Sequence, residues 1–284
     1  MEVYTVNAFA KRSGGGNGAG VVPDASGLTE EQMQSIAKLL GFSETAFVSP
    51  SARADLRLRF FTPAGEVPLC GHATIGTFSV LGATGRLDPG EYIQETGAGC
   101  LRVRLGEDGT VLMEQSKPVF SGQADREAIA RSLCGSAEEL LNPELDVEIV
   151  STGLRDILVP VRSREVLWRI RPDFQQVSRL SRDYDVVGYH LFTEETLERA
   201  AAHCRNLAPL YGIPEEAATG TSTGALCCCL FRRGRIGAGV LTAFEQGYSM
   251  DRPSEILACV QVREKEIQEV WVGGRAMDIE KREL

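Results

Sequence analysis

The stretch FFTPAGEVPLCGHAT, residues 60–74, carries the strongest structural signals in the chain. An apolar run is followed by a Pro/Gly turn, an acid, and a Cys-Gly-His sequence that opens a predicted helix. Backbone amides at a helix N-terminus lack intrahelical acceptors, and the helix macrodipole favours negative charge there. The stretch therefore predicts an anion-binding helix start at Gly71 and His72, with Cys70 next to it.

A second stretch, AATGTSTGAL at residues 217–226, has the same order of turn, small residues and apolar helix. The apolar interiors predict two buried central helices, one from His72 to about Leu81 and one over residues 222–233. The two stretches lie roughly 150 residues apart, far beyond the 20 to 50 residues of a solenoid repeat. They indicate duplicated domains; the alternative is a chance similarity of two glycine-containing helix starts.

The length of 284 residues is sufficient for two domains, each with its own core. The chain has 39 acidic and 30 basic side chains, a net charge of −9, so a nucleic-acid partner is not expected. No window approaches the ~18 apolar residues of a membrane span, and the N-terminus has no secretory pattern. We expect a cytoplasmic protein without a membrane partner.

The eight cysteines are spread along the chain without a CxxC pair, which favours reduced thiols over a disulfide framework. The consecutive residues Cys227, Cys228 and Cys229 would point about 100° apart on a helix and cannot converge on one metal ion. We expect them to be core thiols. The three histidines show no metal-ligand spacing and no dinucleotide fingerprint is present, so no cofactor and no metal are expected.

Periodicity predicts further elements along the chain. Apolar residues at i, i+3, i+4 and i+7 predict a helix from Leu28 to Leu40 ending at Gly41, and period-two alternation predicts a strand over residues 55–61. Residues 13–20 are interpreted as a turn, after which Val21 and Val22 resume the sheet. Other predicted helices cover 127–133 and 194–201, and other strands cover 2–9, 46–48, 101–105, 111–114, 147–150 and 157–161.

Several side chains near the two stretches could carry chemistry. Glu44 precedes an apolar strand, where burial would raise its pKa and make it a proton carrier; the alternative is an exposed glutamate at a helix-to-strand corner. His72 lies at a helix start, in a functional or a purely structural role. A helix N-terminus could lower the thiol pKa of Cys70 and make it a base. The matching place in the second half holds Thr219, a far weaker acid, preceded by Glu216, whose alternative role is that of a solvated loop residue.

These residues resemble the PhzF (phenazine biosynthesis-like) family, which shares the two-domain fold of diaminopimelate epimerase. The resemblance rests on ordered blocks spanning nearly the whole chain, which are GGNGAGVV at 15–22, SETAFV at 43–48, FTPAGEVPLCGHAT at 61–74, STGLRDILVPV at 151–161, LAPLYGIPEEAATGTSTGAL at 207–226, QGYSMDRPSEI at 246–256 and VWVGG at 270–274.

The resemblance implies an α+β fold of two pseudo-symmetric domains, each a curved, mostly antiparallel sheet wrapped around a central helix, with the active site in the cleft between them. The domains would cover residues 1–117, joined by a C-terminal strand at 275–284, and residues 118–274. It also implies a homodimer and a cofactor-independent isomerase acting on a small carboxylate.

Carried over residue by residue, the family's proton carrier is Glu44, and His72 and Glu216 help to orient the substrate. The substrate carboxylate would meet helix-start amides at Gly71, Gly220 and Thr221, with Cys70 and Thr219 beside them.

The chain departs from the family pattern at the second helix start. The family usually has EDPATGSA where this chain has EEAATGTS, so Glu216 replaces an aspartate and Thr221 a serine. Glu216 is one methylene longer, and we expect a shifted backbone or a smaller ligand. Two alternative functions remain: a racemase or epimerase using Cys70, which would require a second base, and a non-catalytic ligand-binding module of the same fold.

Overall fold

The computed structural model describes residues 1–284, and the chain divides into two compact units. Unit 1 comprises Met1–Glu114 together with Gly273–Leu284, and unit 2 comprises Gln115–Val272. The chain therefore passes between the units twice, and its last strand belongs to the unit that contains its first.

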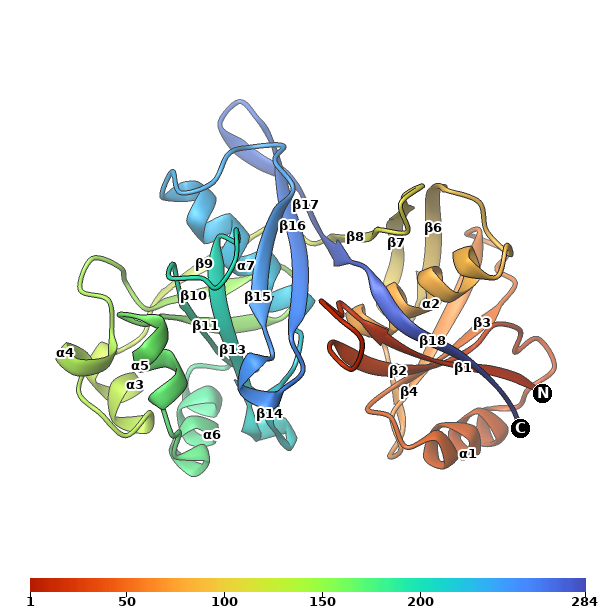
Figure 1. Cartoon of the computed structure of the whole chain (residues 1–284), viewed down its shortest axis with the longest axis horizontal. Helices are drawn as coiled ribbons and strands as arrows, with labels where there is room; N and C mark the ends of the chain where they lie inside the picture. The colour runs from red at the N-terminus through yellow and green to blue at the C-terminus, as the bar shows by residue number, and fades with distance from the viewer. The chain divides into compact units, whose positions relative to one another are not determined.

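Unit 1 is a curved sheet in which most neighbouring strands are antiparallel. Strand β18 pairs with β1, and the order continues through β2, β3, β4, β6, β7 and β8, with the short β5 attached to β4. Only the β2–β3 and β4–β6 pairs are parallel. Figure 1 shows β18 running beside β1, with the two termini close together. The strands are β1 (Glu2–Ala8), β2 (Asn17–Val22), β3 (Thr45–Ser49), β4 (Leu56–Phe61), β5 (Glu66–Val67), β6 (Gly90–Thr96), β7 (Gly99–Leu105), β8 (Val111–Gln115) and β18 (Ala276–Glu283).

Two helices complete unit 1. Helix α1 (Glu30–Leu40) is amphipathic, is capped by Thr29 in a capping box and ends at Gly41 in the left-handed conformation, as predicted. Helix α2 (Gly71–Ala83) is apolar on all sides and buried from His72 to Leu81. It contacts strands β1, β2, β3, β7 and β18, so the sheet wraps around it, and the prediction of a buried central helix is confirmed.

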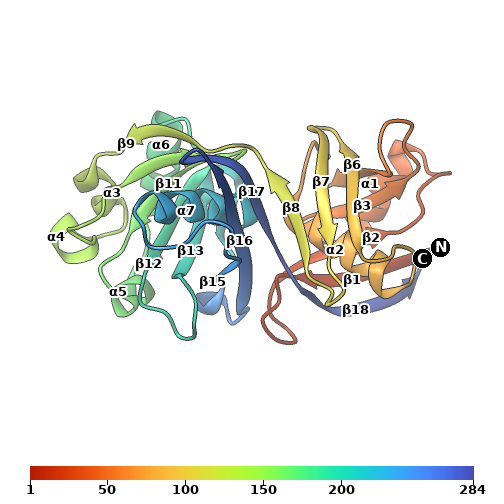
Figure 2. The ribbon, with the colours of Figure 1, turned by 90° about the horizontal axis from the view of Figure 1, so that it is seen from above.

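Unit 2 repeats this plan around helix α7 (Gly220–Arg232). Its strand order is β9, β10, β11, β12, β13, β15, β16, β17, with the short β14 attached to β13. Figure 2 shows α7 among the strands of this unit, and it contacts β10, β11 and β16. The strands are β9 (Val119–Gln123), β10 (Glu148–Ser151), β11 (Arg155–Pro160), β12 (Gly188–Thr193), β13 (Ala202–Ala208), β14 (Ile213–Glu216), β15 (Thr242–Gln246), β16 (Ser254–Arg263) and β17 (Glu266–Gly274).

Four further helices lie outside the sheet of unit 2, together with two single turns of 3₁₀ helix. The helices are α3 (Arg126–Ser132), α4 (Ala137–Leu140), α5 (Arg164–Arg169) and α6 (Phe174–Asp183), and the 3₁₀ turns are Pro209–Tyr211 and Tyr248–Met250.

The two units share one internal topology. In unit 2 the parallel pairs are β11–β12 and β13–β15, which occupy the places of β2–β3 and β4–β6 in unit 1. Helices α2 and α7 follow the short strands β5 and β14 in the same way. The α+β fold of two pseudo-symmetric halves is therefore confirmed, and the similarity of the two helix starts is not a coincidence.

Three local predictions are wrong. Residues 194–201 form a loop rather than a helix, because the buried Glu245 carboxylate accepts the amides of Leu197 and Glu198. Helix α7 begins two residues before Ser222, at Gly220. The predicted turn over residues 13–20 already contains strand β2; at Gly20 a Cβ atom would lie 2.7 Å from Thr45 Oγ1, so glycine allows β2 to approach β3.

All eight cysteines are free, and Cys227, Cys228 and Cys229 are buried in α7 as core thiols. None of the helices is both long enough and apolar enough to cross a membrane.

Candidate functional site

Helix α2 begins where the chain leaves an extended conformation at Cys70 (φ −142°, ψ 115°). The Cys70 side chain makes no capping hydrogen bond to the amides of Gly71 and His72. The helix interior is buried, and only Gly71 at its start is partly exposed. The amides of Gly71 and His72 thus form an N-terminus that can receive an anion.

Glu44 immediately precedes strand β3 and lies against this helix start. Its carbonyl oxygen accepts the amide of Gly20 at 3.1 Å, which fixes its backbone beside the end of β2. Its Oε2 lies 3.2 Å from His72 Nε2, although the two residues are far apart in sequence. The His72 side chain is 7 % exposed and that of Glu44 is 19 % exposed, so the carboxylate is the more accessible partner.

Polar groups from three segments surround the His72 ring. Ser43 Oγ lies 3.4 Å from Nε2, the atom that also faces Glu44. Asn17 Nδ2 lies 3.4 Å and Cys70 Sγ 3.5 Å from Nδ1. The structure therefore brings together three of the sequence-predicted residues of unit 1, Glu44, Cys70 and His72, and adds Asn17 and Ser43, which sequence reasoning did not assign.

The ionisation of this cluster differs from the sequence-based expectation. Burial alone would raise the pKa of Glu44, but the hydrogen bond and charge of His72, with Ser43 and Cys70, outweigh it and lower that pKa. Burial disfavours the His72 imidazolium, yet Cys70 and Glu44 raise its pKa. Glu44 is thus a carboxylate at neutral pH, the state required of a general base.

Cys70 is buried within the same cluster. Burial raises the pKa of its thiol despite the opposing effect of His72, so the expected lowering by the helix N-terminus is wrong. Ligand atoms of Glu44, Cys70 and His72 all lie within 4.8 Å of one another. These are three donor types that bind transition metals, and the spacing of the histidines alone did not predict such a group.

The matching helix start in unit 2 has a different polar arrangement. Thr219 is the N-cap of α7 (φ −130°, ψ 100°) and, like Cys70, makes no capping hydrogen bond. Its hydroxyl instead donates to Glu216 Oε2 at 2.6 Å and accepts from Gln246 Nε2 at 3.0 Å. The predicted residues Glu216, Thr219, Gly220 and Thr221 are all partly exposed and lie together at this helix start.

Sequence reasoning gave Gln246 no role, although it opens the quoted QGYSMDRPSEI block. Its Nε2 also donates to the carbonyl oxygen of Glu216 at 2.8 Å, and its Oε1 accepts the Thr219 amide at 3.3 Å. The next residue, Gly247, has φ +81°, and a Cβ atom there would lie 2.6 Å from the carbonyl oxygen of Ala217. The Gln-Gly pair was therefore a usable signal for a tight turn against this helix start.

The carboxylate–imidazole pair has no counterpart in unit 2. Strand β12 begins at Gly188, so the place equivalent to Glu44 holds Val187. The second position of α7 holds Thr221 where α2 holds His72. A carboxylate paired with an imidazole is thus present at only one of the two otherwise similar helix starts.

A buried polar chain lies beneath α7 in unit 2. Asp156 Oδ2 accepts from Ser222 Oγ at 2.6 Å, and Ser222 Oγ accepts from Asn206 Nδ2, which also lies 3.2 Å from His190 Nδ1. Burial raises the pKa of Asp156 to about 7, with the Ser222 hydrogen bond opposing and Glu216 adding to the effect. Burial lowers the pKa of His190 to about 3, so this imidazole is neutral. A lone acid in the apolar segment RDILVPV was the available sequence signal.

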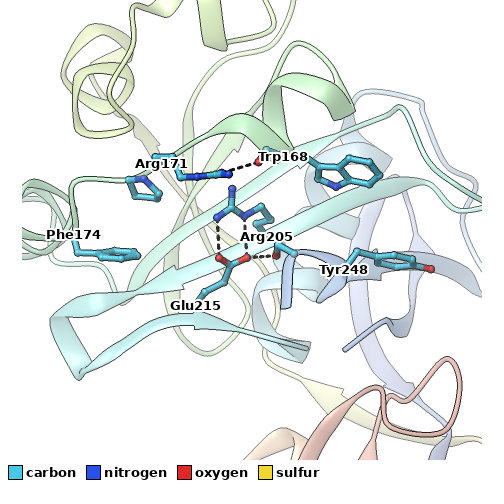
Figure 3. Close-up of a pocket in the computed structure, with 8 residues that line it drawn as sticks. Trp168, Arg171, Phe174, Arg205, Glu215 and Tyr248 are labelled. Carbon is cyan, nitrogen blue, oxygen red and sulfur yellow. Dashed lines mark hydrogen bonds and ion pairs between the residues drawn. The ribbon is translucent and has the colours of Figure 1, made fainter. Parts of the chain in front are cut away.

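Unit 2 also contains a cavity of about 510 Å³ (Figure 3). Arg205 is at its floor, paired with Glu215 through two hydrogen bonds of 2.9 and 2.8 Å, and Trp168 and Phe174 line its sides. Arg205 also donates to the carbonyl oxygens that end helix α5. The ion pair therefore has a structural role, and none of the sequence-predicted site residues lines this cavity.

Comparison with known proteins gives one consistent family. The model of phenazine biosynthesis-like proteins, PhzC-PhzF, matches residues 6–282. An uncharacterized isomerase of Deinococcus radiodurans is 37 % identical over 281 residues, covering 95 % of this chain and 90 % of the relative. The trans-2,3-dihydro-3-hydroxyanthranilate isomerase of Pseudomonas fluorescens is 29 % identical over 279 residues, covering 96 % and 95 %.

The comparison with solved structures supports the same family. A crystal structure of a Bacillus anthracis phenazine biosynthesis protein of the PhzF family superposes with a TM-score of 0.91 at 31 % identity, covering 100 % of this chain and 98 % of the other. The family match and the shared fold both extend over nearly the whole length. The chain belongs to the PhzC-PhzF family of phenazine biosynthesis-like proteins.

Proposed function

We propose that this protein is an isomerase that moves a proton within a small cyclic or unsaturated carboxylate, with Glu44 as the proton carrier. The observation that carries the proposal is the partly exposed Glu44 carboxylate held 3.2 Å from His72 Nε2 at the start of α2. Relatives over the full length of the chain are named isomerases, which supports the same reaction class.

The proposed reaction needs only a base that is regenerated. Glu44 removes a proton from a carbon acidified by conjugation with the substrate carboxylate, and the electron pair is delocalised into the conjugated system. The protonated Glu44 then returns the proton to a second carbon, so a double bond shifts and no atom is gained or lost. Positioned general bases contribute about 10²–10⁴-fold to such steps.

The remaining predicted residues are proposed to bind the substrate. His72 orients Glu44 and a polar substrate group, and the backbone amide of Gly71 stabilises negative charge at the helix N-terminus. Glu216, Thr219, Gly220 and Thr221 are proposed as polar contacts in unit 2. The hydrogen bond from Thr219 to Glu216 and the one from Gln246 to Thr219 support this role, because they hold two of these side chains in place.

The two alternative functions receive less support. A racemase needs two opposed bases. The pKa of the Cys70 thiol is raised by burial, and the equivalent helix start holds Thr219, whose hydroxyl donates a hydrogen bond to Glu216. A non-catalytic binding module would have no need for an ionised carboxylate against a buried imidazole. Both alternatives make different predictions for the variant described next.

The substitution Glu44→Gln is expected to lower turnover by at least about 10²-fold, because the glutamine amide cannot accept a proton from the substrate. Glutamine retains the shape of the glutamate side chain. The assay is proton NMR in ²H₂O with a panel of small cyclic and unsaturated carboxylates that includes trans-2,3-dihydro-3-hydroxyanthranilate. It detects both double-bond migration and deuterium incorporation.

Glu31→Gln is the matched control, because this exposed glutamate of α1 lies outside the cluster and its replacement should leave turnover unchanged. Wild-type turnover in Glu44→Gln would refute the proposed mechanism. Deuterium exchange at a substrate α-carbon that depends on Cys70 would favour the racemase instead.

A further inference from the structure

The proposed isomerase reaction gives the Cys70 thiol no part, although this thiol lies in one cluster with Glu44 and His72. Their ligand atoms all lie within 4.8 Å of one another, with 3.2 Å between Glu44 Oε2 and His72 Nε2. Cys70 Sγ lies 3.9 Å from the same nitrogen and 3.5 Å from His72 Nδ1. Zinc binds thiolate at about 2.3 Å and nitrogen or oxygen at about 2.0–2.2 Å, so two of its tetrahedral ligands lie roughly 3.3–3.6 Å apart. The observed separations bracket this value.

The chemical types of the three donors are those of a thiophilic cation site. Thiolate and imidazole select for Zn²⁺ and similar ions over Mg²⁺ and Ca²⁺, which prefer oxygen. Three protein ligands with a fourth position left for water are typical of zinc sites that stay open to solvent. We propose that Glu44, Cys70 and His72 bind a thiophilic divalent cation such as Zn²⁺, and that its presence blocks proton transfer by Glu44.

The surroundings of the cluster favour binding without rearrangement of the backbone. Cys70 and His72 lie on the first turn of the buried helix α2, and Glu44 is fixed beside β2 and β3. When His72 Nε2 binds a metal, its Nδ1 carries the proton, and the Asn17 amide lies 3.4 Å from that atom. With its oxygen turned toward the ring, Asn17 accepts this proton, which is the outer contact typical of metal-bound histidines.

The proposed metal ion takes the place of protons on its ligands. The Cys70 thiol and the protonated His72 imidazole each release a proton to solvent as the metal–sulfur and metal–nitrogen bonds form, and the Glu44 carboxylate becomes a ligand. The positive charge of the bound cation lowers the basicity of the ligated Glu44 carboxylate, so Glu44 no longer removes the substrate proton and turnover stops. Metal binding itself is independent of the proposed function; only its inhibitory effect rests on Glu44 being the proton carrier.

The test uses Co²⁺ as a spectroscopic probe in a Cys100→Ser/Cys134→Ser background, because these two exposed thiols could bind metal adventitiously. Titration of this protein with Co²⁺ alone is expected to give one ion per chain, with a sulfur-to-cobalt charge-transfer band and intense visible bands of a tetrahedral ion. Zn²⁺ should then remove these bands by displacement, and bound Zn²⁺ should inhibit the isomerase.

In the same background, Cys70→Ser is expected to abolish the charge-transfer band and to weaken Co²⁺ binding by about 100-fold or more. Glu44→Gln should keep the band but weaken binding at least about 10-fold. A charge-transfer band in Cys70→Ser, unchanged affinity in Glu44→Gln, or no band at all in the background protein would each overturn the proposal.

The experiments can refute the proposed metal site and the proposed isomerase mechanism independently of each other. Loss of activity in Glu44→Gln, together with no Co²⁺ binding by the background protein that retains Glu44, removes the metal site and leaves the isomerase mechanism. Co²⁺ binding that depends on Cys70, together with full activity of Glu44→Gln, refutes the isomerase mechanism and leaves the metal site. Circular dichroism of each variant verifies that it is folded, and Glu44→Gln tests the site even where Cys70→Ser does not fold.

Discussion

At the scale of single residues, two carboxyl groups show how neighbours rather than burial alone set ionisation. Glu44 is partly buried and has a lowered pKa because the His72 imidazole lies against it. Asp156 is fully buried beside a serine hydroxyl, with the Glu216 carboxylate as its charged neighbour, and its pKa is raised to about 7. The same functional group is therefore an anion at one site and changes charge near neutral pH at the other.

Asp156 makes the stability of the protein pH-dependent. Its pKa is about 7 in the folded protein and 3.8 for an unperturbed aspartate, so the folded state holds more protons than the unfolded state between these pH values. The stabilising contribution is complete below about pH 4 and is lost as pH rises to about 7, by roughly 4 kcal/mol. Asp156→Asn should lack this decrease, as measured by urea unfolding at several pH values.

The exposed Asp183 supplies the control, since Asp183→Asn should keep the wild-type dependence on pH. Parallel profiles of unfolding free energy for Asp156→Asn and wild type would show that Asp156 ionises in the folded protein as it does in the unfolded chain.

At the scale of elements, helix α2 is held by packing rather than by its own capping or charges. It has no side-chain cap and no acid in its first turn, and it is buried on nearly all sides. At Gly76 an added Cβ atom would lie 2.8 Å from Val6 Cγ1 of strand β1. A glycine in the middle of this helix is thus a site of close approach between helix and sheet.

Gly76→Ala is expected to lower the free energy of unfolding by about 1–2 kcal/mol, because the overpacking penalty exceeds the helix propensity gained. In a Val6→Ala background the methyl group has room, so the same substitution should be stabilising, by up to about 1 kcal/mol. Chemical denaturation of the four proteins gives the coupling, expected at about 1–3 kcal/mol. Additive effects would mean that the two side chains do not meet.

At the scale of the whole molecule, the first unit is completed only by the last strand of the chain. Strand β18 pairs with β1 along its length, and Asp278 accepts hydrogen bonds from Asn7, Ser13 and Gly14. Unit 2 is built from one continuous segment, Gln115–Val272. The two units therefore depend differently on the C-terminus.

A chain ending at Arg275 should lose order in unit 1 while unit 2 stays folded. Without β18, strand β1 has an unpaired edge, and the 13–16 turn loses its acceptor. Hydrogen exchange read by mass spectrometry should show lost protection in β1 and β2 and unchanged protection in β12 and β13. Removal of Leu284 alone is the control. Uniform loss of protection in both units would indicate that they fold as one cooperative body.

Much of the fold was predictable because its signals are local. The caps and periodicity of α1, the all-apolar α2 and α7, and the alternation in β4 depend on residues within a few positions of each other. The loop at 194–201 was mispredicted because its amides are bound by Glu245, a residue from a distant strand. Family motifs located the candidate site, but not Asn17, Ser43 or Gln246 as its polar neighbours.

The sequence by itself determined two helix starts, their buried helices and the family to which the chain belongs. Only the tertiary structure decided which carboxylate meets His72, that this lowers rather than raises the pKa of Glu44, and that Cys70 completes a three-donor cluster. The physical reason is that helix starts are encoded by neighbouring residues. The contacts of His72 depend instead on the parallel pairing of β2 with β3, which brings residues 17, 43 and 44 to one helix.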